Sequence, residues 1–281
     1  MRRIKLIVAY DGTNYCGWQV QPNGITVQEV LNRALSDLFG KETACIGASR
    51  TDAGVHALGN VAVFDTEARM PADRIAFALN TRLPADIRIQ GSSEVPLDFH
   101  PRFTSTVKTY EYRILNRTFA DPTRRLNSYF WYGALDVDAM RQAASYLVGT
   151  HDFKSFATAK PEVTDTVRTI YETSVEKEDV LIRLRITGNG FLYNMVRIIA
   201  GTLIQVGAGV KKPEDMESIL AGQDRELAGP TAPAGPAALR RRSVPRRRSQ
   251  TPPIPATQRL SSTRCSPVCA RQVCSQREQR R

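Results

Sequence analysis

The hydrophobic positions in the first hundred residues indicate an ordered alternation of strands and helices. Residues 2–10 (RRIKLIVAY) have the composition of a strand. Residues 26–39 carry apolar side chains on one stripe at helical spacing, and Thr26 followed by Glu29 is a capping box that predicts where this helix starts. The elements expected next are strands at 43–50 and 59–66, a helix from 71 to about 82 and a strand near 87–94. The order βαββαβ predicts a ferredoxin-like unit.

The second half of the chain repeats this plan loosely. Its expected elements are a strand at 107–115, a helix at 136–148, strands at 166–176 and 180–187, a long apolar helix at 190–206 and a short helix from Pro213. A closing strand is due after them. Residues 228–234 (AGPTAPA) are followed instead by a segment that is rich in Arg, Pro and Ser and has no hydrophobic periodicity. The pattern therefore predicts an α+β protein with halves at 1–103 and 104–234, the second lacking its final strand, and a disordered tail at 235–281.

The basic charge of the chain is concentrated in this tail. The net charge is +11, but residues 240–281 hold twelve arginines and one acid, which leaves 27 basic and 27 acidic residues in 1–239. Nucleic-acid binding by the body must therefore rest on local patches and not on bulk charge. We hypothesise that residues from about 235 onward are a frameshift product, and an arginine-rich RNA-binding arm is the alternative. Either reading predicts an unpaired sheet edge where the last strand should be.

Cysteine usage and hydropathy limit the class of protein further. Cys16 and Cys45 stand alone in the body, which favours a reducing compartment without a disulfide framework. The tail has a C-x3-C-x4-C spacing without a fourth ligand, so no metal site is predicted there. No run of eighteen apolar residues occurs, and the sequence predicts a cytoplasmic protein without a membrane span.

Residues 48–59 (ASRTDAGVHALG) are the first candidate for chemistry, because Arg50, Asp52 and His56 stand among small residues that cannot fill a core. A strand-to-loop turn explains Asp52 and Gly54 structurally. A hydrolase pair of Asp52 and His56, or a metal site, is a second interpretation. The other two histidines stand alone and no H-x-H or HExxH spacing occurs, which disfavours a metal site.

Two further segments carry polar groups in apolar surroundings. Arg197 lies in the middle of the expected helix 190–206, where a buried guanidinium must be paired or must reach solvent along its own stem. Residues 108–114 (KTYEYRI) alternate aromatic and charged side chains. Their tyrosines either pack across strands or face a cleft, where Tyr110 could stack on a base; periodicity does not distinguish the two.

Six blocks of the sequence resemble the TruA family of tRNA pseudouridine synthases. The resemblance covers residues 1 to about 234, and its blocks are YDGTNYCGWQVQPNGITVQEVL (10–31), SRTDAGVHALGNVAVF (49–64), FHPRF (99–103), KTYEYRI (108–114), GTHDFKSF (149–156) and GNGFLYNMVRIIAGTL (188–203). It implies two ferredoxin-like halves that form an extended, mostly antiparallel sheet, with helices on one side and a central active-site cleft. It also implies a homodimer that acts on tRNA at uridines 38, 39 and 40 of the anticodon stem-loop. Because the conversion of uridine to pseudouridine has no net redox change and carries no group away, we expect no cofactor, and the ligand spacings predict no metal.

The resemblance assigns roles to four residues of this chain. It implies that Asp52 is the essential carboxylate, Arg50 its neighbour in the RTD triplet, Tyr110 the residue that contacts the base, and Arg197 the arginine that pairs with Asp52. Whether Asp52 attacks the sugar or removes a sugar proton stays open. A catalytically inactive RNA-binding relative is a rival reading, but it predicts a broken RTD triplet, and the triplet is intact here.

Because the body has no excess charge, we expect phosphate contacts from individual side chains. The candidates for contact with RNA are Lys108, Arg102, His56, Lys154 and Arg168.

Overall fold

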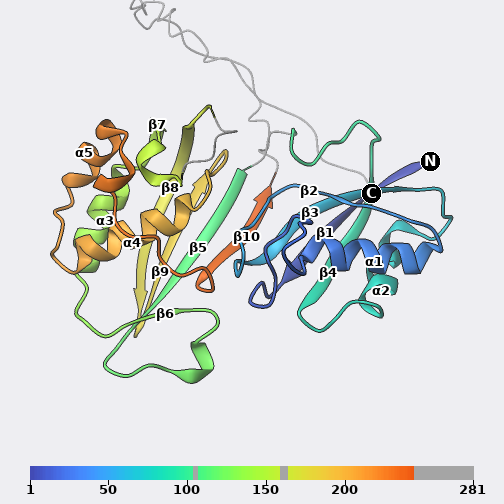
Figure 1. Ribbon diagram of the computed structural model, residues 1–281, viewed down its shortest axis with the longest axis horizontal. Helices are drawn as coiled ribbons and strands as arrows, with labels where there is room; N and C mark the ends of the chain where they lie inside the picture. Colours follow the sequence, from blue (N-terminus) through green and yellow to red (C-terminus); the bar gives the residue numbers. More distant parts are fainter. Residues whose placement is uncertain (104–106, 159–163, 244–281) are drawn as a thin grey trace, which may run out of the picture. The chain divides into compact units, whose positions relative to one another are not determined.

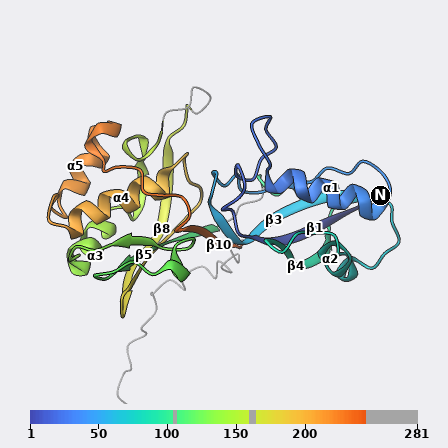
Figure 2. The same ribbon diagram turned by 60° about the horizontal axis from the view of Figure 1, so that its bottom comes forward.

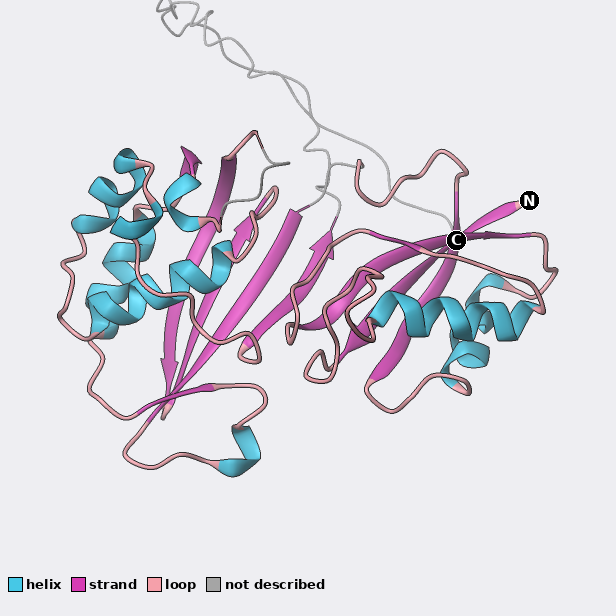
Figure 3. Ribbon diagram, in the orientation of Figure 1, coloured by secondary structure: helices cyan, strands magenta, loops and turns pink. Residues whose placement is uncertain are grey.

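The computed structural model describes residues 1–103, 107–158 and 164–243, which belong to one compact unit that extends to Pro245 (Figures 1 and 3). Most of its strands belong to one sheet in the order β4-β1-β3-β10-β5-β9-β8-β7, with β2 paired to β3 and β6 paired to β5. Two of the strand pairs, β10 with β3 and β5 with β6, are parallel, and the others are antiparallel. None of the helices within these residues combines the length and the apolar composition that a membrane span requires.

The N-terminal half follows the predicted order. It contains β1 (Arg2–Tyr10), α1 (Val27–Phe39), β2 (Ile46–Gly47), β3 (His56–Thr66), α2 (Ala72–Asn80) and β4 (Ile87–Val95). The Thr26 side chain accepts a hydrogen bond from the Glu29 amide at 3.3 Å, and Gly40 ends α1 in the left-handed conformation with φ 65°. The strand expected at 43–50 is only two residues long, because the chain leaves the sheet toward the loop that follows.

The C-terminal half repeats the βαββαβ plan with additions. It contains β5 (Val107–Asn116), β6 (Tyr129–Trp131), α3 (Val137–Ser145), β7 (Gly149–Asp152), β8 (Val167–Glu178), β9 (Leu181–Gly188), α4 (Met195–Gly207), α5 (Asp215–Gly222) and β10 (Ala237–Ser243). The short strands β6 and β7 were not predicted. The helix expected over 190–206 begins only at Met195, because Asn194 has φ 60° and breaks the helical path. Arg197 therefore lies in the first turn of α4 and not in its middle.

Strand β10 corrects the expectation that the second half lacks its final strand and that order ends near residue 235. It lies between β3 and β5, where its backbone pairs with both, and so joins the sheets of the two halves (Figure 1). Its side chains alternate: Ala237 and Leu239 are buried in the core, whereas Arg240 faces the other side. An arginine-rich stretch can thus form an inner strand when only alternate positions are apolar. The tail and the frameshift hypothesis concern residues 235–281, of which 244–281 lie outside the described residues.

The two faces of the sheet differ in chemistry. Buried residues alternate with less buried ones along β1 and β9, and the helices of each half pack on the face of these buried residues over a separate hydrophobic cluster (Figure 2). On the opposite face Glu111 is fully buried and accepts hydrogen bonds from three guanidinium groups. These are Arg113 at 2.8 Å, Arg185 at 2.8 Å and Arg240 at 2.9 Å. Because a buried carboxylate requires paired charges, this cluster also fixes β10 against β5.

Candidate active site

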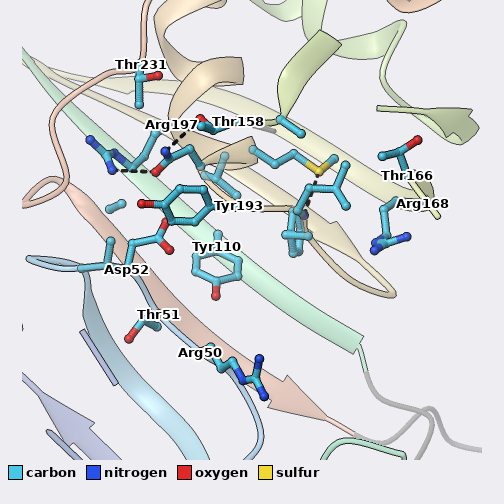
Figure 4. A pocket seen from close by; sticks show the side chains of 18 of the residues that line it. Arg50, Thr51, Asp52, Tyr110, Thr158, Thr166, Arg168, Tyr193, Arg197 and Thr231 are labelled. Carbon is cyan, nitrogen blue, oxygen red and sulfur yellow. Dashed lines mark hydrogen bonds between the residues drawn. The ribbon is translucent and has the colours of Figure 1, made fainter. Parts of the chain in front are cut away.

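A cavity of about 1400 Å³ opens between the two halves, beside the junction formed by β10 (Figure 4). The N-terminal half contributes the turn Arg50 to Ala53 and residues of the loop between β1 and α1. The C-terminal half contributes Tyr110 from β5, the segment Phe191 to Arg197, and side chains near β7 and β8. Among the described residues that line it, five are cationic and three are acidic. They are Arg50, Lys154, Arg168, Arg197 and Arg225, and Asp52, Asp152 and Asp224.

Asp52 lies on a tightly anchored turn between β2 and β3. The Val55 amide donates to the Asp52 carbonyl at 3.1 Å, and Gly54 has φ 76°, so the chain reverses here. The preceding Thr51 is held twice: its carbonyl accepts from the Trp18 amide at 3.1 Å, and its hydroxyl lies 2.7 Å from the buried Tyr10 hydroxyl. Asp52 itself is half-buried and faces the cavity. The turn thus presents one carboxylate on a rigid support.

The other two acids of the cavity wall have structural partners. The Asp152 carboxylate accepts from the Lys154 amide at 3.0 Å and from the Thr166 hydroxyl at 2.6 Å. The Asp224 carboxylate caps the short turn after it by accepting from the Glu226 amide at 3.0 Å. Both carboxylates thus stabilise loops at the rim of the cavity. Asp52 is the third acid of this wall, and it lies on the anchored turn described above.

Tyr110 faces the cavity. This decides between the two positions, core or cleft, that the sequence left open for the tyrosines of KTYEYRI. Tyr112, two residues later on the same face of β5, is fully buried in the core. The half-buried ring of Tyr110 instead contacts Phe191 edge to face, with ring centroids 5.0 Å apart. Figure 4 shows Tyr110 between Arg50 and Arg197, close to Asp52. One tyrosine of KTYEYRI thus serves the core and the other the cavity.

Arg197 is partly buried at the start of α4, and two contacts fix its guanidinium. Its Nε donates to the Ala232 carbonyl at 2.7 Å, and its Nη1 donates to the Asn194 side-chain oxygen at 2.8 Å. The Asn194 amide nitrogen in turn donates to the Thr158 hydroxyl at 3.0 Å. Arg197 and Asp52 line the same cavity, and their direct pairing stays a prediction.

The predicted RNA contacts divide into two groups. Arg50, Lys154 and Arg168 line the cavity. Lys108 and Arg102 are not among its lining residues; Lys108 is on β5 two residues before Tyr110, and Arg102 donates from Nε to the Gly47 carbonyl at 3.0 Å.

His56 also lies outside the cavity lining, because its ring links two loops. Its Nε2 lies 2.8 Å from the Leu126 carbonyl, and its Nδ1 lies 3.0 Å from both the Gly12 amide and an Asp11 carboxylate oxygen. A carbonyl requires a donor, so Nε2 donates to Leu126, while Nδ1 either accepts from the Gly12 amide or donates to the Asp11 carboxylate. With both nitrogens occupied, His56 is not available as the partner of Asp52 in a hydrolase.

The sequence did not single out several residues of the wall. Tyr193 and Asn194 both line the cavity, and Figure 4 shows the Tyr193 ring next to Asp52. Arg225 fixes the loop after it by donating to the Gly229 carbonyl at 2.9 Å and the Thr231 hydroxyl at 3.2 Å. The GNGFLYN segment contained a signal for a bend at Asn194, since Asn adopts the left-handed conformation more readily than most residues, but none for Tyr193. Within the described ranges no three His, Cys, Asp or Glu side chains are grouped to hold a metal ion.

A family model and curated relatives match this chain in sequence. The family described as tRNA pseudouridine synthase matches residues 6–104 and 143–241. The tRNA pseudouridine synthase A of Thermoanaerobacter sp. (strain X514) is 48% identical over 235 residues, which are 83% of this chain and 96% of that protein. The protein of the same name from Geobacter sp. (strain M21) is 50% identical over 234 residues, 83% of this chain and 95% of its own length. A solved archaeal box H/ACA Nop10-Cbf5 complex covers 80% of this chain and 60% of its own at 12% identity, with a TM-score of only 0.34.

Proposed function

The chain belongs to the tRNA pseudouridine synthase family, and we propose that it isomerises uridine to pseudouridine in tRNA with Asp52 as the catalytic carboxylate. The observation that carries this proposal is the position of Asp52 on the anchored turn of a cavity that Tyr110 and Arg197 also line. The expected substrate positions are uridines 38, 39 and 40 of the anticodon stem-loop, since the relatives with 48–50% identity are tRNA pseudouridine synthases A.

The reaction needs what this cavity offers. The C1′–N1 glycosidic bond of uridine breaks, the uracil turns, C5 bonds to C1′, the proton on C5 leaves and N1 takes up a proton. Atoms and electrons balance, so the reaction needs neither an oxidant nor a cofactor. An ionised Asp52 beside the sugar either attacks C1′ or removes a sugar proton, and in both cases it must reach the reaction as a carboxylate.

Arg197 is proposed to keep that carboxylate ionised. A lone acid in a desolvated pocket takes up a proton, and an opposite charge at hydrogen-bond distance prevents this. The contacts of Arg197 with Ala232 and Asn194 use Nε and Nη1, so Nη2 is the nitrogen best placed to serve Asp52. The guanidinium therefore has a fixed orientation before substrate binds, which reduces the reorganisation that the reaction requires.

The remaining residues are proposed to bind the extruded nucleotide. A uridine in a stem is stacked and paired, so it must leave the helix at a cost of about a few kcal/mol. Tyr110, supported from one side by Phe191, offers its ring to the uracil. Arg50 is exposed at the cavity wall, where it can occupy the vacated space and bind phosphate, and Lys154 and Arg168 extend the cationic surface.

Tritium release tests this function directly. The full chain is incubated with unmodified tRNA carrying tritium at C5 of its uridines, and we expect tritium to enter water as pseudouridine forms. A protein that only binds RNA, or a hydrolase, would bind tRNA and release none. Parallel transcripts with cytidine at position 38, 39 or 40 would show which uridines are used.

We also propose that the protein acts as a homodimer in the cytoplasm. Sedimentation equilibrium of the full chain tests the first statement, with a dimer mass expected. A monomer that still releases tritium would contradict it. Fractionation of the source cells tests the second.

A further inference from the structure

An exposed aromatic pair lies outside the cavity, at the end of the FHPRF motif. The Phe103 side chain is 83% exposed, which is the highest exposure among the large hydrophobic residues of the described part. Its ring is stacked on His100, with centroids 4.3 Å apart and an interplanar angle of 23°. The Arg102 amide donates to the Nδ1 of His100 at 3.2 Å, which holds the imidazole in place beneath the phenyl ring. The outer face of Phe103 is thus presented to solvent on a fixed support.

Two cations accompany this pair, Arg102 within the same motif and Arg50 on the cavity wall. The Arg102 Nε donates to the carbonyl of Gly47, three residues before Arg50, and Arg50 lines the cavity. Burial lowers the pKa of Arg102, and repulsion from the positive charge of Arg50 lowers it further. Such a pair is stabilised when a phosphate binds between them. Aromatic rings next to positively charged side chains are the recurring surface of single-stranded nucleic-acid sites.

We propose that Phe103, supported by His100, is a stacking platform for a second, unpaired base of the substrate tRNA. The phosphate next to that base would bind Arg102 and Arg50. This inference rests on the proposed function and extends it, since it places a second nucleotide contact outside the cavity that receives the reacting uridine. A nucleotide displaced from its stack when the target uridine is extruded has the chemistry that this surface would recognise.

Phe77 provides a matched control on the same half of the protein. It is 68% exposed on α2, and the Arg74 guanidinium lies 5.8 Å from its ring centroid. Its cation is therefore supplied by a neighbour on the same helix, and Arg74 itself lies 3.9 Å from the Asp73 carboxylate. Phe77 is not stacked on a second ring among the described residues. The two phenylalanines thus share size and exposure but differ in the features that the proposal requires.

The test measures equilibrium binding of an unmodified tRNA transcript to the full chain by fluorescence anisotropy. Phe103→Ala is expected to raise the Kd about 5- to 150-fold, which is the loss of about 1–3 kcal/mol per stacked base converted at about 1.4 kcal/mol per tenfold. Phe103→Trp, which keeps an aromatic ring at this position, should bind tRNA as tightly as wild type. Phe77→Ala should change the Kd less than twofold. Because the lost contact is uncharged, Phe103→Ala should leave the salt dependence of binding unchanged. Arg102→Gln should instead reduce the slope of log K against log salt by about one.

Three outcomes would overturn the proposal. The first is a Kd for Phe103→Ala equal to that of Phe77→Ala. The second is a sedimentation mass that falls in Phe103→Ala while tRNA affinity is unchanged, which would assign the ring to a protein contact. The third is a failure of Phe103→Trp to restore binding in a folded protein. Binding requires no turnover, so a wild-type protein that binds tRNA without releasing tritium would refute the proposed function while leaving this test readable.

Discussion

The replacement Leu239→Ala tests whether β10 is an integral strand of the sheet. Leu239 is fully buried, and it pairs in register with Ala57 on β3 and with Tyr110 on β5. The change removes three carbon atoms of the side chain with their hydrogens. The burial of these three groups contributes about 2.4 kcal/mol at about 0.8 kcal/mol each. A residual cavity on the order of 50 Å³ adds about 1.2 kcal/mol at about 24 cal/mol per Å³. The expected loss in the free energy of unfolding is therefore about 3.6 kcal/mol.

Urea unfolding followed by tryptophan fluorescence measures this loss, since Trp18 is fully buried in the native protein. With an m-value of about 3 kcal/mol/M, the midpoint should fall by about 1.2 M. Leu58→Ala is the control, because Leu58 is on the neighbouring strand β3 but is 49% exposed, and its loss should cost less than about 0.5 kcal/mol. Equal midpoints for the two variants would refute the packing of β10 between β3 and β5.

Three further changes probe the charges and the anchored turn. Burial raises the pKa of Glu111, but hydrogen bonds and charge from its three arginine partners outweigh burial and hold it below the ordinary value. The stability that this cluster provides is therefore present at neutral pH and is lost as the pH falls below about 4.3. The urea midpoints of wild type and Glu111→Gln should differ at pH 7 and converge toward pH 3. A difference that stays constant with pH would contradict this. Tyr10→Phe leaves the buried Thr51 hydroxyl without its partner, so the thermal midpoint should fall by the equivalent of about 1–3 kcal/mol and tritium release should slow, whereas full activity would show that this bond does not support the turn. Arg197→Met should raise the pKa of Asp52, so residual activity should shift to higher pH, and an unchanged profile would mean that Arg197 serves another acid.

Local signals predicted those elements whose stability is encoded in neighbouring residues. The capping box at Thr26 located the start of α1 to within one residue, because the cap bond lies within a single turn. The start of α4 was missed because Phe191 and Leu192 pack like helical residues although the chain enters the helix only after Asn194. The strand β10 was missed because its stability comes from β3 and β5, which flank it in space and not in sequence.

The site shows the same division between local and distant information. The motifs identified Asp52, Tyr110 and Arg197, which the fold brings to one cavity. The Ala232 carbonyl that orients Arg197 carries no sequence signal, since any residue supplies a carbonyl. His56 was a candidate for catalysis because it follows Asp52 closely in the sequence. In the fold, contacts with two loops occupy both nitrogens of its ring.

The role of Asp52 is tested most directly by tritium release from C5-labelled tRNA with the Asp52→Asn variant. The amide keeps the shape of the side chain and removes its charge, so the variant should bind tRNA within a few-fold of wild type. The account predicts no tritium release above background from this variant under conditions in which the wild type completes the reaction. Release at one tenth of the wild-type rate or more would contradict the assignment of Asp52 as the catalytic carboxylate.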